Sequence, residues 1–168
     1  MRTALLLTSS LCLTACADEQ SETDRAEQDA ATVAMVREAN DRPPPLEEVV
    51  PEAILYPDIE RHDLFGEACA YAPGTSMGVR VIARKVDAYM KIDGEMLRFS
   101  ADPGSRELPS SSHSLYDGRT YSLRLAIDGD GVAEEDSVGV RLYDGTIWLR
   151  DRWDRVVYQG TGTVSCGA

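Results

Sequence analysis

The sequence predicts an all-β domain over residues 54–168, folded as a small antiparallel barrel or sandwich of about seven or eight strands. Three observations predict this fold. Apolar and polar residues alternate in several short runs, which is typical of strands that bury one face. Asp-Gly pairs, which favour tight hairpin turns, separate several of these runs. Cys69 and Cys166 lie near the two ends of the region, where a disulfide would join the first strand to the last.

The N-terminal segment has the layout of a secretory signal. A single basic residue, Arg2, precedes apolar runs at 4–7 and 11–13, and the chain then becomes polar. Apolar runs this short cannot cross the hydrocarbon layer of a membrane, which is about 30 Å thick. We therefore predict a signal peptide over residues 1–15, a tether over 16–53 and a single domain after it.

The tetrapeptide Leu13-Thr14-Ala15-Cys16 resembles the lipobox of bacterial lipoprotein precursors. In that family the signal peptidase cuts before the cysteine, the thiol receives a diacylglycerol and the new amine is acylated. The resemblance implies that Cys16 is a lipid anchor and that the mature protein is attached to a membrane of the bacterial cell envelope, facing the periplasm. Ala17 stands where an aspartate retains such proteins in the inner membrane, which favours the outer membrane.

The four cysteines separate into three groups once the signal is removed. Cys12 leaves with the signal, Cys16 takes the lipid, and Cys69 and Cys166 remain. Exported proteins meet an oxidising compartment, so we expect a disulfide between the remaining two. It would close a loop of nearly the whole domain, worth about 4 kcal/mol in the chain-entropy model. The alternative is two separately buried thiols.

The chain is strongly acidic. Its net charge of −12 becomes −13 when Arg2 is removed with a signal that holds no acidic residue. Such a protein repels the phosphates of nucleic acids and anionic lipid head groups, so we expect no nucleic acid partner. Three alternatives account for the negative charge: solvation by water, binding of a metal cation, or binding of a cationic protein.

The predicted tether is acidic and poor in aromatic residues. Its residues 23–39 could form a marginal helix capped by Thr23, with a thin apolar stripe at three-residue steps. The triple proline at 43–45 favours an extended conformation and ends any helix before it. We expect the segment to behave as a flexible linker.

The folded region opens with a turn-rich segment at 56–66. Its polar residues suggest a metal site, but the spacing of His62 and His113, the only histidines, offers no ligand pair. We interpret the polar residues of this segment as solvent-exposed and predict no metal. The candidate ligands are Asp58, Glu60, His62 and Asp63. A short strand over 67–71 then carries Cys69.

The clearest local pattern is a hairpin of strands at 86–92 and 95–99. Asp93-Gly94 is a favoured pair for a two-residue type I′ turn. This turn sets Met90 opposite Leu97 and Ala88 opposite Phe99, and both pairs are apolar. The predicted outer face carries Tyr89 beside Arg98.

A long loop at 101–119 follows, with the run Ser110-Ser111-Ser112-His113-Ser114. A nucleophilic serine beside His113 is one interpretation of the run. Adjacent residues have no geometric reason to form a catalytic pair, and no Gly-x-Ser-x-Gly elbow is present. We interpret the segment as a solvated loop and predict no catalytic residue.

A strand at 121–127 is followed by an acidic cluster from Asp128 to Asp136. The cluster suggests calcium, but Val132 stands where the EF-hand pattern needs an oxygen ligand. Glycine-aspartate repeats at strand ends are usually turns. A turn is therefore our prediction, with a weak cation site as the alternative.

The last third of the chain predicts two more hairpins. A turn at Asp144-Gly145 would set Arg141 against Trp148 outside, and a connection at 151–154 would lead into a final strand that reaches Cys166. Trp153 would stand at an exposed tip, either as a partner anchor or without a role. The inner pairs predicted for the two hairpins are Leu142 with Ile147, Val140 with Leu149, Leu149 with Val156 and Ile147 with Tyr158.

No dinucleotide-binding glycine pattern, phosphate loop or zinc-helix motif occurs, so we predict a non-enzymatic, lipid-anchored envelope protein without a cofactor. The architecture resembles the small lipoprotein inhibitors of C-type lysozyme, which share a lipobox, an acidic tether, an antiparallel barrel and a cysteine near each end of the domain. That resemblance implies, as an alternative, a periplasmic inhibitor of a cationic enzyme. The family's loop motif pairs serine with glycine before an aromatic residue, whereas Ser114-Leu115-Tyr116 lacks the glycine. A ligand-binding barrel, the third class, predicts an apolar cavity.

Overall fold

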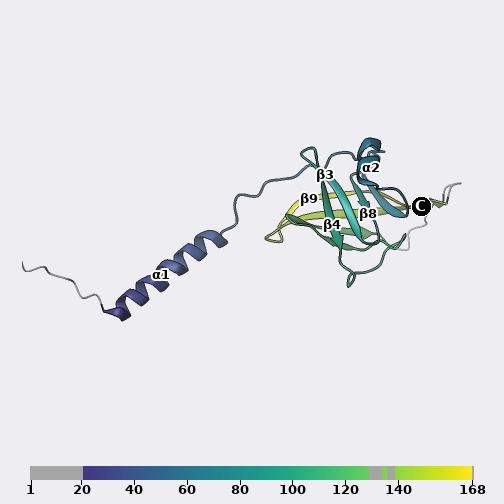
Figure 1. Cartoon of the computed structure of the whole chain (residues 1–168). Coiled ribbons are helices and arrows are strands. Elements are labelled where there is room, and N and C mark those ends of the chain that lie inside the picture. The colour runs from purple at the N-terminus through teal and green to yellow at the C-terminus, as the bar shows by residue number, and fades with distance from the viewer. Residues whose placement is uncertain (1–20, 129–133, 136–138, 168) are drawn as a thin grey trace, which may run out of the picture. The chain divides into compact units, whose positions relative to one another are not determined.

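The computed structural model describes residues 21–128, 134–135 and 139–167 of the chain. The predicted signal peptide at 1–15, the predicted lipid anchor Cys16 and most of the acidic cluster between Asp128 and Asp136 lie outside the described residues. The chain divides into two compact units, Met1–Pro44 and Pro45–Ala168. Both units are drawn in Figure 1.

The described part of the first unit is a single helix, α1, over Glu22–Asp41. It begins where the Ser21 hydroxyl accepts the backbone N–H of Thr23 at 3.2 Å, and Glu22 and Asp24 place negative charge at the positive end of the helix dipole. None of its 20 residues is buried. The marginal helix predicted over 23–39 with Thr23 as its cap is therefore a full helix, Glu22–Asp41, capped by Ser21, because this cap and many strong helix formers support it locally.

The second unit is a closed antiparallel β-barrel (Figure 1). The sheet has nine strands in the order β6-β5-β4-β3-β2-β1-β9-β8-β7, and a further pairing of β6 with β8 closes all of them except β7 into a ring. This confirms the all-β prediction and shows a barrel. The strands are β1 Ala68–Pro73, β2 Val81–Ala83, β3 Asp87–Ile92, β4 Glu95–Ala101, β5 Leu115–Asp117, β6 Tyr121–Ile127, β7 Glu134–Glu135, β8 Arg141–Asp151 and β9 Val156–Gly167.

The β3–β4 hairpin has the predicted register. Met90 pairs with Leu97, and Ala88 pairs with Phe99. The turn residues Asp93 and Gly94 have φ angles of 51° and 76°, both positive as a type I′ turn requires. The two-residue turn and the apolar pattern specify one register, which the structure confirms.

The predicted turn at Asp144-Gly145 is wrong. β8 runs through both residues without a break and pairs with β9 on one side and β6 on the other. A Cβ atom at Gly145 would lie 2.6 Å from Cγ2 of Val164 and 2.7 Å from the carbonyl oxygen of Ala126. Gly145 is thus required by the close approach of two neighbouring strands rather than by a turn.

The final hairpin exists, but its predicted pairs are wrong. Leu149 pairs with Tyr158, and Ile147 pairs with Gly160. A register shift between Leu149 and Arg150 brings Arg150 opposite Val156, so Val157 is the extra residue of a bulge and its side chain is buried. The pairing of Arg150 with Val156 is already one position beyond the predicted register, and the bulge adds a second position, so Leu149 meets Tyr158 instead of Val156.

The barrel interior is filled by apolar side chains from every strand of the ring and by Leu108 from the loop after β4. The largest of those that are almost completely inaccessible are Tyr71, Tyr116, Phe99, Met90, Leu123, Leu125, Ile147 and Leu149.

The segment 49–54, which we name the strap, runs from β9 to β3 before the barrel begins. The N–H of Val49 donates to the carbonyl of Val157, that of Glu52 to the carbonyl of Lys91, and that of Ile54 to the carbonyl of Val79. Val49 also packs against the barrel core. The compact unit consequently starts at Pro45, earlier than the predicted boundary at residue 54, because apolar residues of the acidic segment find partners in the barrel.

Helix α2 covers one outer wall of the barrel. It spans Tyr56–His62, where the sequence suggested a turn-rich segment. Four buried residues form a second apolar cluster, Ile54, Leu64, Ile82 and Tyr89. Tyr89 belongs to this second cluster. Its side chain is consequently buried, although it lies on the face of the hairpin that was predicted to point outward.

Candidate functional site

The disulfide between Cys69 and Cys166 joins β1 to β9, as predicted. The two residues are direct partners in the β1–β9 register, with Cα atoms 4.1 Å apart, and both side chains are buried. The bond links positions 97 residues apart in the chain. It closes the seam at which the first and last strands of the barrel meet.

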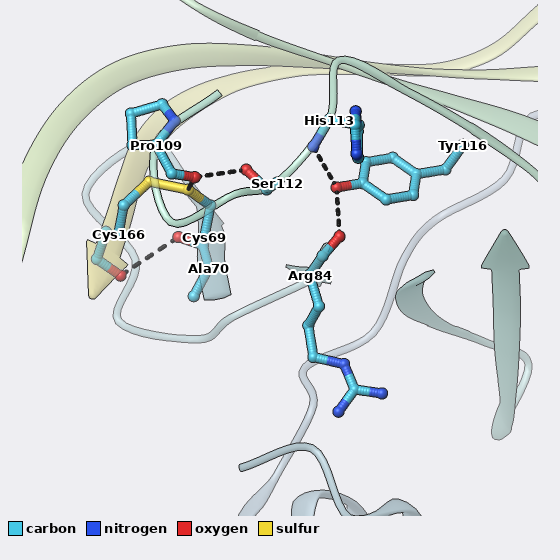
Figure 2. The surroundings of a disulfide bond; sticks show 9 residues. Cys69, Ala70, Arg84, Pro109, Ser112, His113, Tyr116 and Cys166 are labelled. Carbon is cyan, nitrogen blue, oxygen red and sulfur yellow. Dashed lines mark hydrogen bonds between the residues drawn. A yellow bond between two sulfur atoms is a disulfide. The ribbon is translucent and has the colours of Figure 1, made fainter. Parts of the chain in front are cut away.

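The loop between β4 and β5 lies against this disulfide (Figure 2). The carbonyl oxygen of Pro109 lies 3.2 Å from Sγ of Cys69 and accepts the Ser112 hydroxyl at 2.8 Å. The Ser112 N–H also donates to Pro109 at 3.2 Å, which closes a tight turn. Its central residues Ser110 and Ser111 have φ angles of 53° and 52°. Positive φ at both positions is costly for residues other than glycine and marks a site of local strain.

Tyr116 holds the other side of the same loop (Figure 2). Its hydroxyl donates to the carbonyl of Arg84 at 2.9 Å and accepts the backbone N–H of His113 at 2.6 Å. Burial of the phenol raises the pKa of Tyr116 above its ordinary value, so the neutral donor form persists. The hydroxyl network thereby fixes the loop on the barrel end.

The serine run does not form the contacts of a nucleophile in the part of the chain that the structure describes. The Ser112 hydroxyl is completely buried and bonded to a backbone carbonyl, while the ring of His113 packs edge-on to Tyr116 at 6.4 Å between centroids. Nδ1 of His113 is buried without a hydrogen-bond partner among the described residues. The arrangement closes one end of the barrel with a strained loop.

A surface depression of about 400 Å³ lies beside the disulfide. Its charged residues are Glu67 and Arg141. The complete lining is Glu67, Pro109, Ser110, Gly139, Arg141, Cys166 and Gly167.

Asp87, the first residue of β3, has a buried carboxylate that binds two arginines. Its side chain accepts Nε of Arg84 at 2.8 Å and Nε of Arg98 at 3.0 Å, and the Tyr89 hydroxyl lies 3.3 Å away. Burial alone would raise the pKa of Asp87, but the two guanidinium groups outweigh it and hold that pKa below its ordinary value. Asp87 is therefore a charged anchor for two arginines.

The predicted polar segment at 56–66 contains a second anchored carboxylate. Asp58 accepts the N–H of Leu55 at 3.0 Å, which lowers its pKa, and Nζ of Lys91 at 3.0 Å lowers it further. Asp58 is buried, so the interpretation of this residue as solvent-exposed is wrong. Across residues 21–128, 134–135 and 139–167, no three His, Cys, Asp or Glu side chains are grouped so that they could hold a metal ion.

Both tryptophans pack against arginines. Trp153 in the β8–β9 turn is half-buried between Arg152 and Arg155, whose guanidinium carbons lie 4.9 and 5.1 Å from its ring centroid. Trp148 packs against Arg124 at 5.4 Å. The predicted pair of Arg141 with Trp148 is wrong, because Trp148 pairs with β6 and β9 instead of with an earlier segment of its own strand.

The inner face of β9 shows how tightly the barrel is filled. A Cβ atom at Gly160 would lie 2.5 Å from the hydroxyl of Tyr71 and 2.6 Å from that of Tyr158. Burial raises the pKa of the Tyr71 phenol well above its ordinary value. Phenolic side chains thus occupy the space that a ligand would need at this position.

In the parts of the chain that the structure describes, no helix is both long and apolar enough to span a bilayer. Comparison of the chain with protein-family models, with curated proteins and with solved structures finds no match.

Proposed function

We propose that this protein is a lipid-anchored, non-enzymatic component of the bacterial cell envelope that presents an acidic β-barrel domain to the periplasm. The observation that carries the proposal is a tetrapeptide ending at Cys16 that resembles a lipobox, in a chain whose domain is closed by the Cys69–Cys166 disulfide. Disulfides persist in exported proteins and are rare in the reducing cytosol. The two features support the same compartment by independent chemistry.

Helix α1 supports a spacer role for the segment between the anchor and the domain. It has 20 residues, none of them buried, and its described side chains are mostly polar. At about 1.5 Å per residue, such a helix extends about 30 Å. A spacer of that length would hold the barrel clear of the lipid head groups, which an acidic domain avoids.

The anchor is tested by replacing one cysteine. In the native bacterium we expect Cys16→Ser to abolish incorporation of labelled palmitate and to leave an uncleaved precursor, because the thiol is the site of both steps. The matched control is Cys12→Ser, which removes a thiol of the signal and should be processed normally. Palmitate labelling that survives Cys16→Ser would refute the anchor.

The alternative function is binding and inhibition of a cationic enzyme such as a C-type lysozyme. The net charge of −12 supports it, since an acidic surface steers a basic partner toward itself. A soluble protein that begins at residue 17, after the predicted signal and anchor, should then inhibit hen lysozyme, with an effect that weakens as salt is added. Absence of inhibition at micromolar protein would remove this alternative and leave the anchor proposal untouched.

A further inference from the structure

A cleft of about 430 Å³ opens in the barrel wall between β4 and the turn that joins β5 to β6. One bank is β4 itself and the other is the turn. The lining residues are Glu95, Met96, Leu97, Arg98, Phe99, Gly118, Arg119, Thr120 and Tyr121.

The cleft exists because β5 is too short to cover its neighbour. β4 pairs with β3 from Glu95 to Ser100, whereas β5, with only three residues, pairs with β4 at Ser100 and Ala101 alone. Among the described residues, β4 therefore has no strand opposite Glu95–Phe99 on the side of the cleft. A closed barrel normally removes free edges, and this one retains a short one.

The direction of the free backbone groups follows from two hydrogen bonds. The N–H of Ala101 donates to the carbonyl of Val86, toward β3, whereas the N–H of Asp102 donates to the carbonyl of Leu115, toward β5. Backbone groups alternate sides along a strand. The N–H and C=O groups of Met96 and Arg98 consequently face the cleft, where a further strand could pair with them.

The side chains around the cleft combine an apolar floor with basic banks. A Cβ atom at Gly118 would lie 2.8 Å from Cδ1 of the buried Phe99, so the two banks meet tightly at one end. Arg98 on one bank keeps 62% of its side chain exposed although it pairs with Asp87. Arg119 on the other bank is exposed. Glu95 also lines the cleft and Arg98 is paired with Asp87, so Arg119 is the cationic side chain that an acidic group of a ligand would meet first.

We propose that the cleft binds an extended peptide segment of a partner protein, which adds to β4 as a strand and carries a carboxylate between Arg98 and Arg119. The unpaired groups of Met96 and Arg98 supply the main-chain hydrogen bonds, and the half-buried Leu97 and Tyr121 lie where an apolar side chain of the peptide would rest. This mode of recognition obtains affinity from backbone pairing and selectivity from alternate side chains. It does not depend on lipidation at Cys16 or on lysozyme binding.

The free protein provides the first test. Hydrogen exchange measured by NMR should be fast at the amides of Met96 and Arg98 and slow at those of Leu97 and Phe99, which face β3. Slow exchange at Met96 and Arg98 in the monomer would show that the edge is already covered and would overturn the proposal.

The second test is titration of the isotope-labelled protein with an acetylated hexapeptide of alternating threonine and valine that carries one central glutamate. We expect saturable shifts centred on Met96, Arg98 and Arg119, and slower exchange at the first two amides. Replacing the peptide glutamate by glutamine, or Arg119 by glutamine, should weaken binding about two- to fivefold, as for an exposed ion pair. Absence of localised shifts at millimolar peptide would overturn the proposal.

The substitution Met96→Pro distinguishes strand addition from simple surface contact. Met96→Pro removes an N–H that faces the cleft and leaves the β3–β4 ladder intact, so the protein should keep its fold and lose peptide binding at least about fivefold. Met96→Val, which keeps the N–H, is the matched control. Exchange at Leu97 and Phe99 reports whether the ladder survives. A concentration-dependent dimer that Met96→Pro abolishes would assign the edge to a second copy of the chain and overturn the peptide partner.

Discussion

Asp87 is a buried carboxylate that joins two arginines, Arg84 and Arg98, on the barrel. Only 2% of it is exposed, and its single negative charge is shared between Arg84 and Arg98. Removing one member of a buried ion group leaves the others charged and unpaired, which costs more than the group contributes as a whole. The sequence offered no sign of this cluster, since Asp87 occupies an ordinary polar position in an alternating strand.

We predict that Asp87→Asn lowers the free energy of unfolding by about 3 kcal/mol, because one neutral amide cannot compensate two guanidinium groups. Urea denaturation followed by circular dichroism measures the change. The matched control is Asp154→Asn, which removes the partner of Arg150 at a side chain that is 86% exposed and should change stability little. Equal effects of the two substitutions would contradict the assignment.

The lowered pKa of Asp87 also predicts a pH dependence. A carboxyl group whose pKa is lower in the folded state contributes stability above its unfolded pKa of about 3.9 and loses it as the pH falls through the folded pKa. The pKa of Asp58 and that of Asp151 are lowered as well and act in the same direction. We expect the urea midpoint to fall steeply below about pH 4 and to fall less steeply in Asp87→Asn. Parallel curves for the two proteins would exclude Asp87 as a source of acid sensitivity.

At the scale of single elements, a comparison of Asp93-Gly94 with Asp144-Gly145 shows that the same dipeptide can form a turn or lie inside a strand. Asp93-Gly94 forms the predicted turn, whereas Asp144-Gly145 lies inside β8. Gly145 is required there because the carbonyl oxygen of Ala126 would lie 2.7 Å from any Cβ atom. A backbone atom held in a sheet cannot move aside as a flexible side chain can.

We predict that Gly145→Ala destabilises the barrel by about 2 kcal/mol, as other overpacked sites do. Thermal denaturation gives the measurement. Gly104→Ala is the control, since its nearest neighbour would be the side chain of Asp102 at 3.3 Å and its φ angle is not positive. A Gly145→Ala protein as stable as the control would show that β6 and β9 can separate there without cost.

In the strained turn beside the disulfide, by contrast, we expect a substitution to stabilise the protein. Ser111→Gly should raise stability by about 0.5–1 kcal/mol, because glycine adopts a positive φ without steric cost. Thr120→Gly, at a position whose φ is not positive, should lower stability slightly through the added freedom of the unfolded chain. Differential scanning calorimetry compares the two variants. A lower melting temperature for Ser111→Gly would mean that the serine side chain contributes more than the strain costs.

At the scale of the whole barrel, closure depends on segments far apart in the chain. The disulfide joins β1 to β9, and the strap at 49–54 connects β9 to β3 from outside the predicted domain. The Glu52 carboxylate also accepts the N–H of Gly94 at 2.7 Å, so the strap holds the tip of the β3–β4 hairpin.

We predict that a chain beginning at residue 54 is less stable than one beginning at residue 45, by about 2 kcal/mol or more, because it loses the half-buried Val49 contact and the backbone hydrogen bonds donated by Val49 and Glu52. A chain beginning at residue 21 should match the one that begins at 45, since α1 buries no residue. Urea denaturation measures the free energy of unfolding of the three proteins. Equal stability of all three would place the boundary at 54 after all.

The sequence by itself determined what depends on neighbours along the chain. Alternation of apolar and polar residues predicts several of the strands, and local turn chemistry predicts the β3–β4 register. The identity of the two paired cysteines follows from a count of thiols. A two-residue turn allows only one register in which both apolar pairs meet. Only the tertiary structure decided the role of Gly145, the bulge at Val157, the strap and the short β5 that leaves the β4 edge open. Each of these depends on which distant strand lies alongside, and that spatial neighbour leaves no mark in the local pattern of residues.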